Sequence, residues 1–499
     1  MELSVIYSRA LAGIEAPLVR VETHLSNGLP AFNIVGMPET AVRESRDRVR
    51  SAIINSHFNF PDRRITVNLA PADLPKEGGR FDLSIALGIL TASGQVPEGL
   101  LPEHECLGEL ALDGSLRPIP GVVPAAMASR DNNRRLVVPA PSASLAARVP
   151  RAAVIAAPNL LTLCAHLNGA EPIALAEAVT TAGHSDCPDL SDVIGQESAR
   201  RALEVAASGS HNLLFFGPPG TGKTLLASRL PGILPPPDPE EALTHLALQN
   251  CQLQLDQPDY LLRPFRAPHH SASAVALVGG GSRPRPGEIS LAHGGVLFLD
   301  ELPEFPRHTL EMLREPMESG EITLSRARHK TTYPARFQLL AAMNPCPCGY
   351  LGDPGRACRC SPEQIQRYRG RISGPLLDRI DLHVAVNRLP ARALLQVDAS
   401  GESSLTIRKR VMACSARQLA RQGLPNAQLS GSALQRYCHL ESSQKRQLEN
   451  AADSLQLSSR ALHRTLRVAR TLADMAKCDI IGREHLLEAL GYRSLDGSQ

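Results

Sequence analysis

A glycine-rich segment near the middle of the chain has the residue types and the spacing of a phosphate-binding loop. It reads HNLLFFGPPGTGKTLLASRL over residues 211–230, an apolar run followed by G-x-x-x-x-G-K-T and a helical pattern. Backbone N–H groups can close around phosphates there, Lys223 can reach the β- and γ-phosphates, and the Thr224 hydroxyl can bind Mg²⁺. We therefore predict an ATP site made by Gly217, Pro218, Pro219, Gly220, Thr221, Gly222, Lys223, Thr224 and Leu225.

Two acids at the end of an apolar run could supply the metal and water chemistry that a phosphate loop requires. The run GGVLFLDEL over residues 294–302 ends in Asp300 and Glu301 before Leu302. Asp300 would hold Mg²⁺, and Glu301 would polarise the attacking water. Two solvated acids at the end of a buried strand are the simpler interpretation of such a pair, but the phosphate loop favours the catalytic one.

Two more polar residues could complete a site for phosphoryl transfer. The apolar run over residues 337–344 ends in Asn344, whose amide could hold the lytic water or the γ-phosphate, although an asparagine before a proline is more often a turn former. Arg379 lies between Asp378 and Asp381, a setting that usually gives a local salt bridge. To act on the ATP of a neighbouring subunit, Arg379 would need an exposed position at a subunit edge.

Four cysteines lie close together in a short loop rich in glycine and proline. The segment MNPCPCGYLGDPGRACRCSP spans residues 343–362. Four thiolates can hold Zn²⁺ in a closed tetrahedral site, which would stiffen a loop too small to have its own core. C-x-C pairs are less usual than C-x-x-C pairs, and four reduced thiols in a flexible loop are the alternative. We predict a structural Zn²⁺ bound by Cys346, Cys348, Cys358 and Cys360.

Two basic segments could contact the phosphates of DNA. ARHKTT follows the strand-like EITLSR and predicts a basic hairpin tip, and LVGGGSRPRPGEIS over residues 277–290 predicts a flexible basic loop. Such contacts would be independent of sequence and sensitive to salt. Basic loops are common surface features, so each segment alone favours a merely solvated loop. The candidate DNA-binding residues are Arg326, Arg328, His329 and Lys330 in the hairpin, and Arg283 and Arg285 in the loop.

The elements that must position these residues are the buried strands of an α/β sheet, because ligands bind at the carboxyl ends of such strands. A chain of 499 residues is too long for one core, and the usual domain size predicts about two to four domains. Apolar spacing from about Gln444 to Leu490 predicts helices. We expect an α/β multidomain protein with a domain at 1–168, a linker at 169–191, an ATPase core at 192–395 carrying the cysteine loop 346–360, and a helical domain at 396–499.

The composition narrows the classes of function. The net charge is +3, and aromatic residues make up 3% of the chain with no tryptophan, so nucleic-acid binding must come from local basic patches rather than bulk charge or base stacking. No stretch approaches the roughly 18 to 20 apolar residues of a membrane span, and the opening segment lacks a long apolar core. We therefore expect a cytoplasmic protein without a membrane partner. Eleven cysteines without an export signal argue against a disulfide framework.

Together with DVIGQESARRALEVAA over residues 192–207, these segments resemble the AAA+ ATPase core of the magnesium-chelatase-like branch. Four longer motifs are similar, in order, to those of the ComM/YifB family, bacterial ATPases linked to DNA uptake and recombination. They read RPFRAPHHSASAVALVGGGSRPRPGEISLAHGGVLFLDELPEF, NPCPCGYLGD, YRGRISGPLLDRIDLHV and SSRALHRTLRVARTLADMA. The resemblance covers essentially the whole chain. It implies a hexameric ring with ATP at the subunit interfaces and the basic hairpin facing the pore.

The same resemblance implies roles for single residues. Those that would act on the ATP of their own subunit are Lys223, Thr224, Asp300, Glu301 and Asn344. Arg379 would act on the ATP of the neighbour. The C-terminal helices would be the lid of the site, where Arg460 matches the family's sensor-2 position. Arg464 and Arg467 lie nearby on a helix, and an arginine-rich helical face is more often simply solvated, so these alternatives stay open.

Residues 1 to about 165 resemble the Lon-protease-type domain, a ribosomal S5 domain 2-like α+β fold that is also fused to the recombination ATPase RadA. A Lon protease needs a serine nucleophile and a lysine base. Matching LPKEGGRFDLSIA to the protease puts Arg80 at the serine position, and LRPIPGVV puts Val123 at the lysine position. Ser84 is the nearby hydroxyl, with no lysine placed to activate it. We expect no peptidase activity and a structural or DNA-binding platform that helps the ring assemble.

The resemblance implies an ATP-dependent DNA motor, a helicase or branch-migration factor that acts in homologous recombination during natural transformation. Its expected partners are DNA, other copies of the chain and recombinase proteins. A magnesium-chelatase-type or protein-remodelling ATPase is the alternative, because the core motifs are shared. The chain has none of the metal-binding regions of chelatase partner subunits, and Arg80 and Val123 disfavour an ATP-dependent protease.

Overall fold

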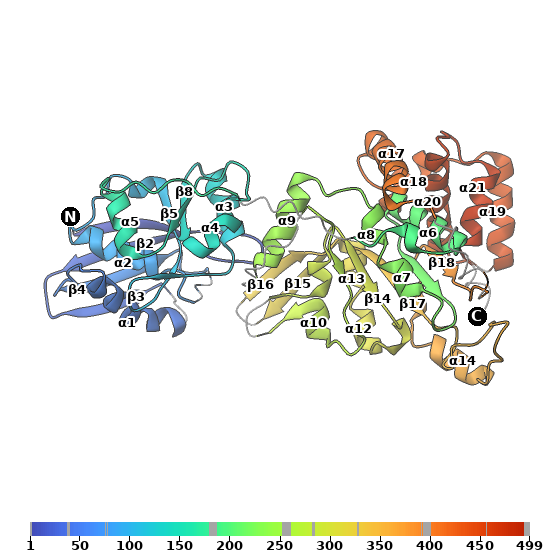
Figure 1. Cartoon of the computed structure of the whole chain (residues 1–499), viewed down its shortest axis with the longest axis horizontal. Coiled ribbons are helices and arrows are strands. Elements are labelled where there is room, and N and C mark those ends of the chain that lie inside the picture. Colours follow the sequence, from blue (N-terminus) through green and yellow to red (C-terminus); the bar gives the residue numbers. More distant parts are fainter. Residues whose placement is uncertain are drawn as a thin grey trace.

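A computed structural model describes most of the chain. The described residues are 2–36, 40–74, 76, 78–178, 187–251, 261–281, 285–326, 329–390, 392, 401–455 and 457–493. They form an elongated molecule with the N-terminal part at one end and the last helices at the other (Figure 1).

The N-terminal part is built on a mixed seven-stranded sheet of order β3-β4-β2-β1-β5-β8-β9. Its strands, with the separate pair β6 and β7, are β1 (Leu3–Arg9), β2 (Leu18–Ser26), β3 (Ala31–Val35), β4 (Arg64–Ala70), β5 (His104–Cys106), β6 (Glu109–Leu110), β7 (Leu116–Arg117), β8 (Arg135–Pro139) and β9 (Val154–Ala157). Its helices are α1 (Thr40–Asn55), α2 (Asp82–Ala92), the 3₁₀ turn η1 (Leu101–Glu103), α3 (Val122–Asp131), α4 (Ala140–Ala146) and α5 (Leu160–Leu167).

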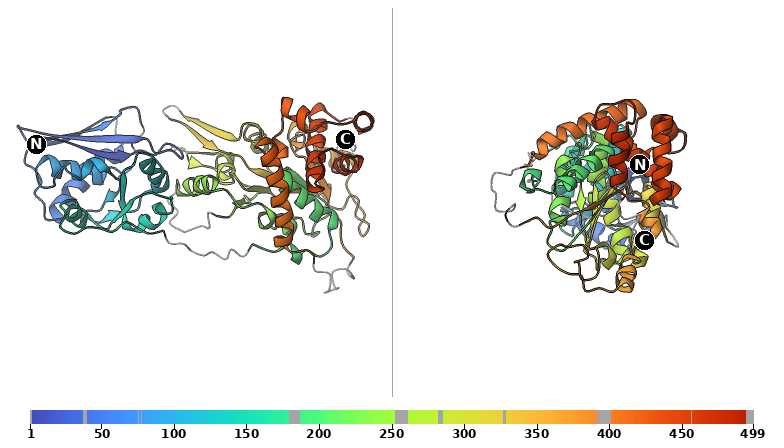
Figure 2. Two further views of the ribbon diagram at one scale, coloured as in Figure 1. Left: turned by 90° about the horizontal axis from the view of Figure 1, so that it is seen from above. Right: turned by 90° about the vertical axis from the view of Figure 1, so that its right-hand side faces the viewer.

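This sheet is covered on one face at β2 but on both faces at β8, where Val137 and Leu136 are buried in two different clusters. In β2, Val19 and Val21 are buried while Arg20 and His24 face outward, the alternation of a strand packed on one side only. Helix α2, buried along its whole length, covers the inner face. The left view of Figure 2 shows the helices gathered beneath these strands.

The central part is built on a five-stranded sheet of order β11-β14-β17-β10-β18 in which every pairing is parallel. Its strands are β10 (Leu213–Phe216), β11 (Phe265–Arg266), β14 (Val296–Leu299), β17 (Gln338–Met343) and β18 (Leu382–Ala385). Two antiparallel pairs stand apart from it, β12 (Gly279–Gly280) with β13 (Arg285–Pro286) and β15 (Glu321–Arg326) with β16 (His329–Pro334). The helices are η2 (Leu190–Asp192), α6 (Glu197–Gly209), α7 (Lys223–Ala227), α8 (Leu230–Ile233), α9 (Pro239–Asn250), α10 (Ala274–Val278), α11 (Glu288–Leu291), η3 (Leu302–Glu304), α12 (Arg307–Glu311), α13 (Arg314–Ser319), α14 (Pro362–Arg369) and α15 (Gly374–Leu377).

The carboxyl ends of three neighbouring strands form the edge that carries the candidate site. Strands β14 and β17 are buried along their whole length, which explains their continuous apolar sequences. In the ladder, Phe216 of β10 lies beside Met343 of β17, and Leu299 of β14 lies beside Ala341 of β17. The residues that follow these strands therefore emerge side by side, as in other α/β sheets that bind ligands.

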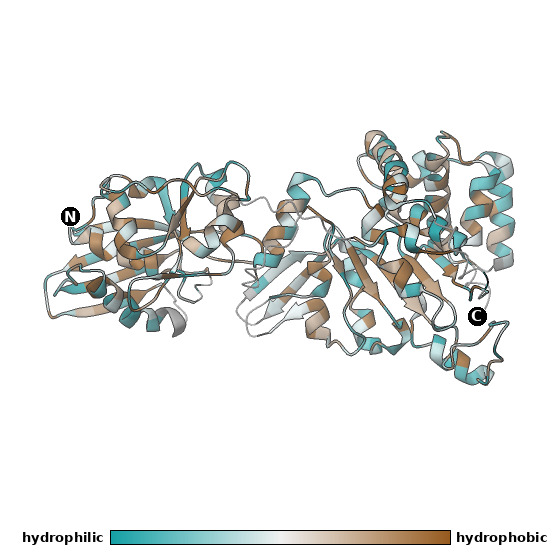
Figure 3. Cartoon of the chain, in the orientation of Figure 1, coloured by the Kyte–Doolittle hydropathy of each residue, from teal (hydrophilic) through white to brown (hydrophobic). Residues whose placement is uncertain are grey.

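The C-terminal part is helical and packs on the central part. Its helices are α17 (Ser404–Gln422), η4 (Asn426–Gln428), α18 (Gly431–Tyr437), α19 (Ser442–Leu455), α20 (Ser459–Met475) and α21 (Arg483–Gly491). Val411 of α17, Val468 of α20 and Leu203 of α6 share one buried core. Figure 3 shows the apolar strands inside and the hydrophilic faces of α19 and α21 outside.

The expected α/β multidomain fold, with a parallel sheet and a C-terminal helical region, is confirmed. The finer division into domains stays a prediction. Leu175, in the predicted linker, bridges to Ile155 of β9, and residues 179–186 lie outside the described residues. Across the described ranges, the structure contains no helix long and apolar enough to cross a membrane.

Helix α9 joins the N-terminal and central parts, between which it lies in Figure 1. Leu243 and Leu246 of α9 are buried in one cluster with Val122 of α3. At the end of α9, the carbonyl of Asn250 accepts the N–H of Gly121 at 3.0 Å. The side-chain oxygen of Asn250 accepts a second N–H from α3, also at 3.0 Å.

Candidate ATP site and the residues around it

The glycine-rich loop leads from β10 into α7 and holds a buried lysine. Gly222, directly before α7, has a φ of 89°, which favours glycine. The Lys223 ammonium donates to the carbonyls of Gly217 at 2.7 Å and Pro218 at 2.9 Å, and to Asn344 Oδ1 at 3.1 Å. Burial lowers the pKa of Lys223. The predicted lysine and asparagine, 121 residues apart, thus meet at one edge of the sheet.

The predicted Mg²⁺ ligands also meet across two strands. Thr224 Oγ1, in the first turn of α7, donates to Asp300 Oδ2 at 2.6 Å. Asp300 Oδ1 accepts the N–H of Glu301 at 2.9 Å, which orients the carboxylate. A hydroxyl and a carboxylate are the oxygen donors that Mg²⁺ prefers, so these residues fit that ion.

Glu301 is held by a histidine that the sequence did not single out. Its backbone has a φ of 52°, uncommon for a residue other than glycine. Glu301 Oε2 lies 3.5 Å from Nδ1 of His270. The His270 ring packs against His269, with centroids 4.0 Å apart, and stands edge-on to Phe305. The motif APHH contained the signal, but only the fold brings His270 to Glu301.

Arg379 does not have the exposed position that we expected of a residue acting in trans. Its side chain is only 4% exposed. It donates to the carbonyl of Pro375 at 2.6 Å and forms an ion pair with Glu318 of α13, whose side chain is 60% exposed. This correction has a physical cause: Leu376 and Ile380 on either side pack into the core, which draws Arg379 inward.

The three candidate arginines among the four of α20 have different surroundings. Arg464 donates to buried Asp381 at 2.8 Å. Burial works against the charge of Asp381, yet Arg464 and His211 hold the pKa of that carboxyl well below its usual range. Burial lowers the pKa of Arg467. Arg460 is exposed in the first turn of the helix, so its sensor-2 role stays a prediction.

The two basic segments form short antiparallel pairs. The backbones of Arg326 and His329 make the last pair of the β15–β16 hairpin. Lys330 is exposed and lies within β16 opposite Ser325, one pair before the end of the hairpin. Exposed Arg285 pairs with Gly280. Arg328 and Arg283 lie outside the described residues.

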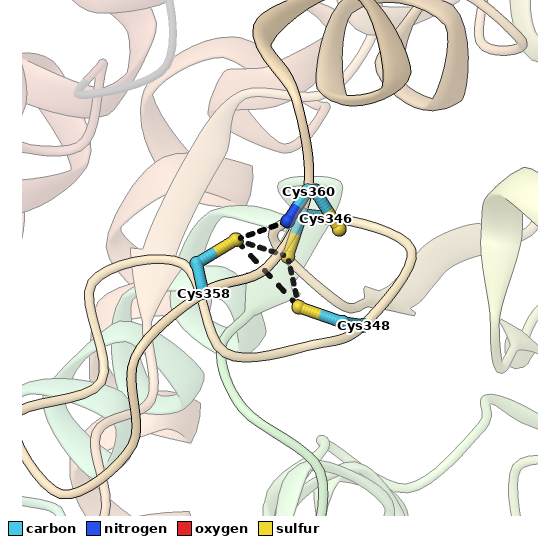
Figure 4. A group of neighbouring side chains, drawn as sticks. All are labelled: Cys346, Cys348, Cys358 and Cys360. Atoms are coloured by element: carbon cyan, nitrogen blue, oxygen red, sulfur yellow. Dashed lines mark hydrogen bonds between the residues drawn. The ribbon is translucent and has the colours of Figure 1, made fainter.

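The four cysteines of the loop gather into one cluster (Figure 4). Cys346 Sγ lies 3.4 Å from Cys348 Sγ and 3.6 Å from Cys358 Sγ, and the ligand atoms of all four, with Cys360, lie within 4.8 Å of one another. A tetrahedral zinc with bonds of about 2.3 Å separates its sulfurs by roughly 3.8 Å. Backbone N–H groups, that of Arg359 foremost, lower the pKa of Cys348 to about 6. The donor set could hold a metal and fits zinc.

The protease-like positions of the N-terminal part are buried. Arg80 donates to the carbonyl of Pro120 at 2.7 Å, and Ser84 donates to the carbonyl of Cys106 at 2.5 Å. The backbone N–H of Val123 is the second group bound by Asn250 of α9. We call Arg80 and Val123 the dyad positions. Val123 lies where α9 docks, and Arg80 bonds to Pro120, whose neighbour Gly121 donates its N–H to Asn250 of α9.

Family models and relatives agree with this geometry. The model of magnesium chelatase subunit ChlI matches residues 189–394, and models of subunit ChlI and of its C-terminal region match 21–142 and 401–493. YifB of Salmonella typhimurium is 51% identical over 497 residues, which cover 99% of this chain and 98% of that protein. The competence protein ComM of Haemophilus influenzae is 50% identical over 501 residues, with the same coverage.

The chain belongs to the ComM/YifB family of magnesium-chelatase-like proteins. The likeness of this family member to Lon is weaker: Lon protease 2 of Bacillus subtilis is 29% identical over 152 residues, which cover 27% of this chain and 26% of that protease. Membership in a family of AAA+ ATPases agrees with the phosphate loop, and with ATP and Mg²⁺ as its ligands. The roles of single residues stay predictions.

Proposed function

We propose that this ComM/YifB-family protein is a hexameric, ATP-driven DNA motor that moves DNA branches during homologous recombination in natural transformation. The observation that carries the ATPase part is the meeting of Lys223, Asp300 and Asn344 at one edge of the parallel sheet. The DNA part is supported by the basic hairpin, and the link to transformation by the name of the competence protein ComM.

The side chains at the sheet edge divide the work of phosphoryl transfer. Lys223 and Asn344 can exchange their mutual hydrogen bond for contacts with the γ-phosphate. Thr224 and Asp300 would hold Mg²⁺, which neutralises charge on the phosphates when bound. In the structure, Glu301 Oε2 lies 3.5 Å from Nδ1 of His270. Once Glu301 has moved away from His270, its carboxylate orients and polarises the attacking water.

In a hexamer, the buried Arg379 would have a catalytic role at the interface between subunits. In the single chain, Arg379 is neutralised by Glu318, a carboxylate that is itself mostly exposed. At a subunit interface the γ-phosphate of the neighbour's ATP can replace Glu318 as the anion. Assembly would then convert a structural ion pair into a catalytic contact. Each ATP site would be complete only between two subunits.

The β15–β16 hairpin is the proposed DNA contact. Exposed Lys330 offers a cation for phosphates, and the Gly280–Arg285 pair offers a second basic strand pair from the same central part. Contacts of this kind bind any sequence and weaken steeply with salt. Helix α13 leads directly into β15. Movement of the hairpin would therefore displace Glu318 of α13 and change its ion pair with Arg379.

The cysteine cluster is proposed to hold one structural zinc. The support is the set of Sγ separations of 3.4 and 3.6 Å among Cys346, Cys348 and Cys358, with Cys360 in reach. Four protein sulfurs leave no position for a water, which favours a structural rather than a catalytic ion. About one zinc per chain is expected in protein purified without chelators.

A magnesium-chelatase-type or protein-remodelling ATPase remains the second candidate, because the matching models carry the name of a chelatase subunit. Movement of a labelled four-way DNA junction by the purified full chain with ATP separates the two. We expect the wild type to move the junction and Lys223→Ala to leave it in place. ATP hydrolysis without movement of either junctions or forks would contradict the DNA motor and favour the second candidate.

A further inference from the structure

The cysteine loop touches the phosphate loop directly. Gly349, which follows Cys348, is buried and has a φ of 83°. A Cβ atom built on Gly349 would lie 2.8 Å from Cδ of Pro219, inside the phosphate loop, and 3.8 Å from Cγ of Asn344. The two loops therefore approach so closely at this point that only glycine fits.

The same contact is tied to the thiol cluster from both sides. The N–H of Gly349 donates to the carbonyl of Cys346 at 3.0 Å, which closes the turn that presents the first two cysteines. Cys346 itself lies two residues after Asn344. Beyond the last two cysteines, Arg369 at the end of α14 donates to the carbonyl of Pro345 at 3.2 Å. The cysteine loop thus begins and ends beside Asn344, the residue whose side-chain oxygen accepts the hydrogen bond from Lys223.

We propose that the metal-loaded cysteine cluster is a brace for the ATP site. The metal fixes the Cys346–Gly349 turn, and this turn presses Gly349 against Pro219 and keeps Asn344 beside Lys223. A loop of this size has little core of its own, so the metal supplies most of the energy that orders it. The inference rests on the metal site proposed above and adds its consequence: metal occupancy sets nucleotide affinity.

The brace must act in both directions. If the metal favours the conformation that binds ATP, then ATP must favour retention of the metal by the same factor. We therefore expect a non-hydrolysed ATP analogue with Mg²⁺ to slow the chelator-driven loss of zinc from the wild-type chain. Nucleotide that leaves the rate of zinc loss unchanged would argue against the coupling.

Two glycines of the loop form a matched pair for the decisive test. Gly349 and Gly352 have φ values of 83° and 80°, so alanine strains the backbone alike at both positions. A Cβ on Gly352 meets nothing within 4 Å, whereas one on Gly349 strikes Pro219. Gly349→Ala should weaken binding of a fluorescent ATP analogue about tenfold, within the usual range of such couplings, and Gly352→Ala should not.

Zinc content measured on the same preparations separates the possible failures. We expect about one zinc per chain in the wild type and both glycine variants, and loss of zinc with a similar loss of nucleotide affinity in Cys358→Ser. Zinc at full content with equal nucleotide binding by Gly349→Ala and Gly352→Ala would overturn the brace and leave the zinc site standing. Wild type purified without zinc would overturn both. If Cys358→Ser fails to fold, the chelator-driven loss of zinc from the wild type still tests the coupling to the metal, and the glycine pair still tests the contact with Pro219.

Discussion

The ATP site and the dyad positions of the N-terminal part are two places where the sequence resembles that of a known active site. At the ATP site, Thr224 bonds to Asp300 and Lys223 bonds to Asn344, so side chains of α7 and of the residues after β14 and β17 hold one another. At the dyad positions, Arg80 bonds to a backbone carbonyl, and the N–H of Val123 is capped by α9. The side-chain partners at the ATP site can be replaced by a substrate, whereas the partners at the dyad positions stabilise the fold.

The difference shows what catalytic competence requires beyond polar residues in an α/β frame. Groups that act on a substrate need bonds they can exchange without breaking the structure. Backbone partners at the dyad positions cannot be released without unpairing buried groups, which costs about 1–3 kcal/mol each. The surface beside the dyad positions is instead where α9 docks, and it connects the N-terminal part to the central part.

The largest effect is expected from the arginine that would complete the ATP site between subunits. Arg379→Ala should lower the rate of ATP hydrolysis by about 10³-fold or more. Because Arg379 and Lys223 would serve the same ATP from different subunits, a mixture of Arg379→Ala and Lys223→Ala chains should recover part of the activity that neither has alone. A mixture as inactive as its components would contradict action in trans. Steady-state phosphate release measures both.

A smaller but still large effect is expected at Glu301. Glu301→Gln keeps the size of the side chain but loses the base, so hydrolysis should fall by about 10²- to 10⁴-fold while ATP affinity stays close to that of the wild type. Separate binding and turnover assays make the distinction. Lys409→Ala, an exposed lysine of α17, serves as the control. Loss of ATP binding in Glu301→Gln would place this residue in binding rather than in chemistry.

At the dyad positions, we expect a substitution to weaken the docking of α9 on the N-terminal part and to leave the rate of ATP hydrolysis unchanged. Asn250→Ala leaves the buried N–H of Val123 without its acceptor, a cost of about 1–3 kcal/mol. Amide hydrogen exchange at residues 121–125 should therefore quicken by roughly 5- to 150-fold if opening of this interface controls exchange there. Thr244→Ala, on the same helix, is the control. Equal exchange in both variants would mean that Asn250 does not secure α9.

The smallest effect is expected at Ser84, whose hydroxyl donates a hydrogen bond to the carbonyl of Cys106. Neither the wild type nor Ser84→Ala should cleave casein, and the variant should lose only the roughly 1 kcal/mol of one hydrogen bond in thermal unfolding. Cleavage by the wild type that Ser84→Ala abolishes would show that the N-terminal part is a working peptidase.

Local sequence predicted the strands of the site, because the apolar runs 213–216, 296–299 and 339–343 are followed by the glycine-rich loop, Asp300 and Asn344. It did not predict the surroundings of Arg379, since the packing of Leu376 and Ile380 that draws it inward appears only in the folded core, and its ion-pair partner Glu318 lies 61 residues away. The same holds for His270 beside Glu301. Such contacts join segments that are distant in sequence, so neither the hydrophobic periodicity nor a short sequence motif predicts them.

The C-x-C pairs marked the cysteine cluster, but they did not show what the cluster touches. Only the fold brings Gly349 onto Pro219, 130 residues earlier in the chain. Likewise, the sequence match showed that the dyad positions lack a serine and a lysine, but not that α9 covers them. Residue types can show that a catalytic pair is absent, whereas the packing of α9 against this region becomes visible only from tertiary contacts.

The most direct test of the account is steady-state ATP hydrolysis by the full chain, with and without branched DNA, beside Lys223→Ala. Lys223 is the one residue that joins the phosphate loop to Asn344 in the site described. We predict hydrolysis by the wild type that branched DNA accelerates several-fold, with loss of this effect at high salt, and no hydrolysis by Lys223→Ala. Hydrolysis that DNA leaves unchanged, or that persists in Lys223→Ala, would contradict a DNA motor driven from this site.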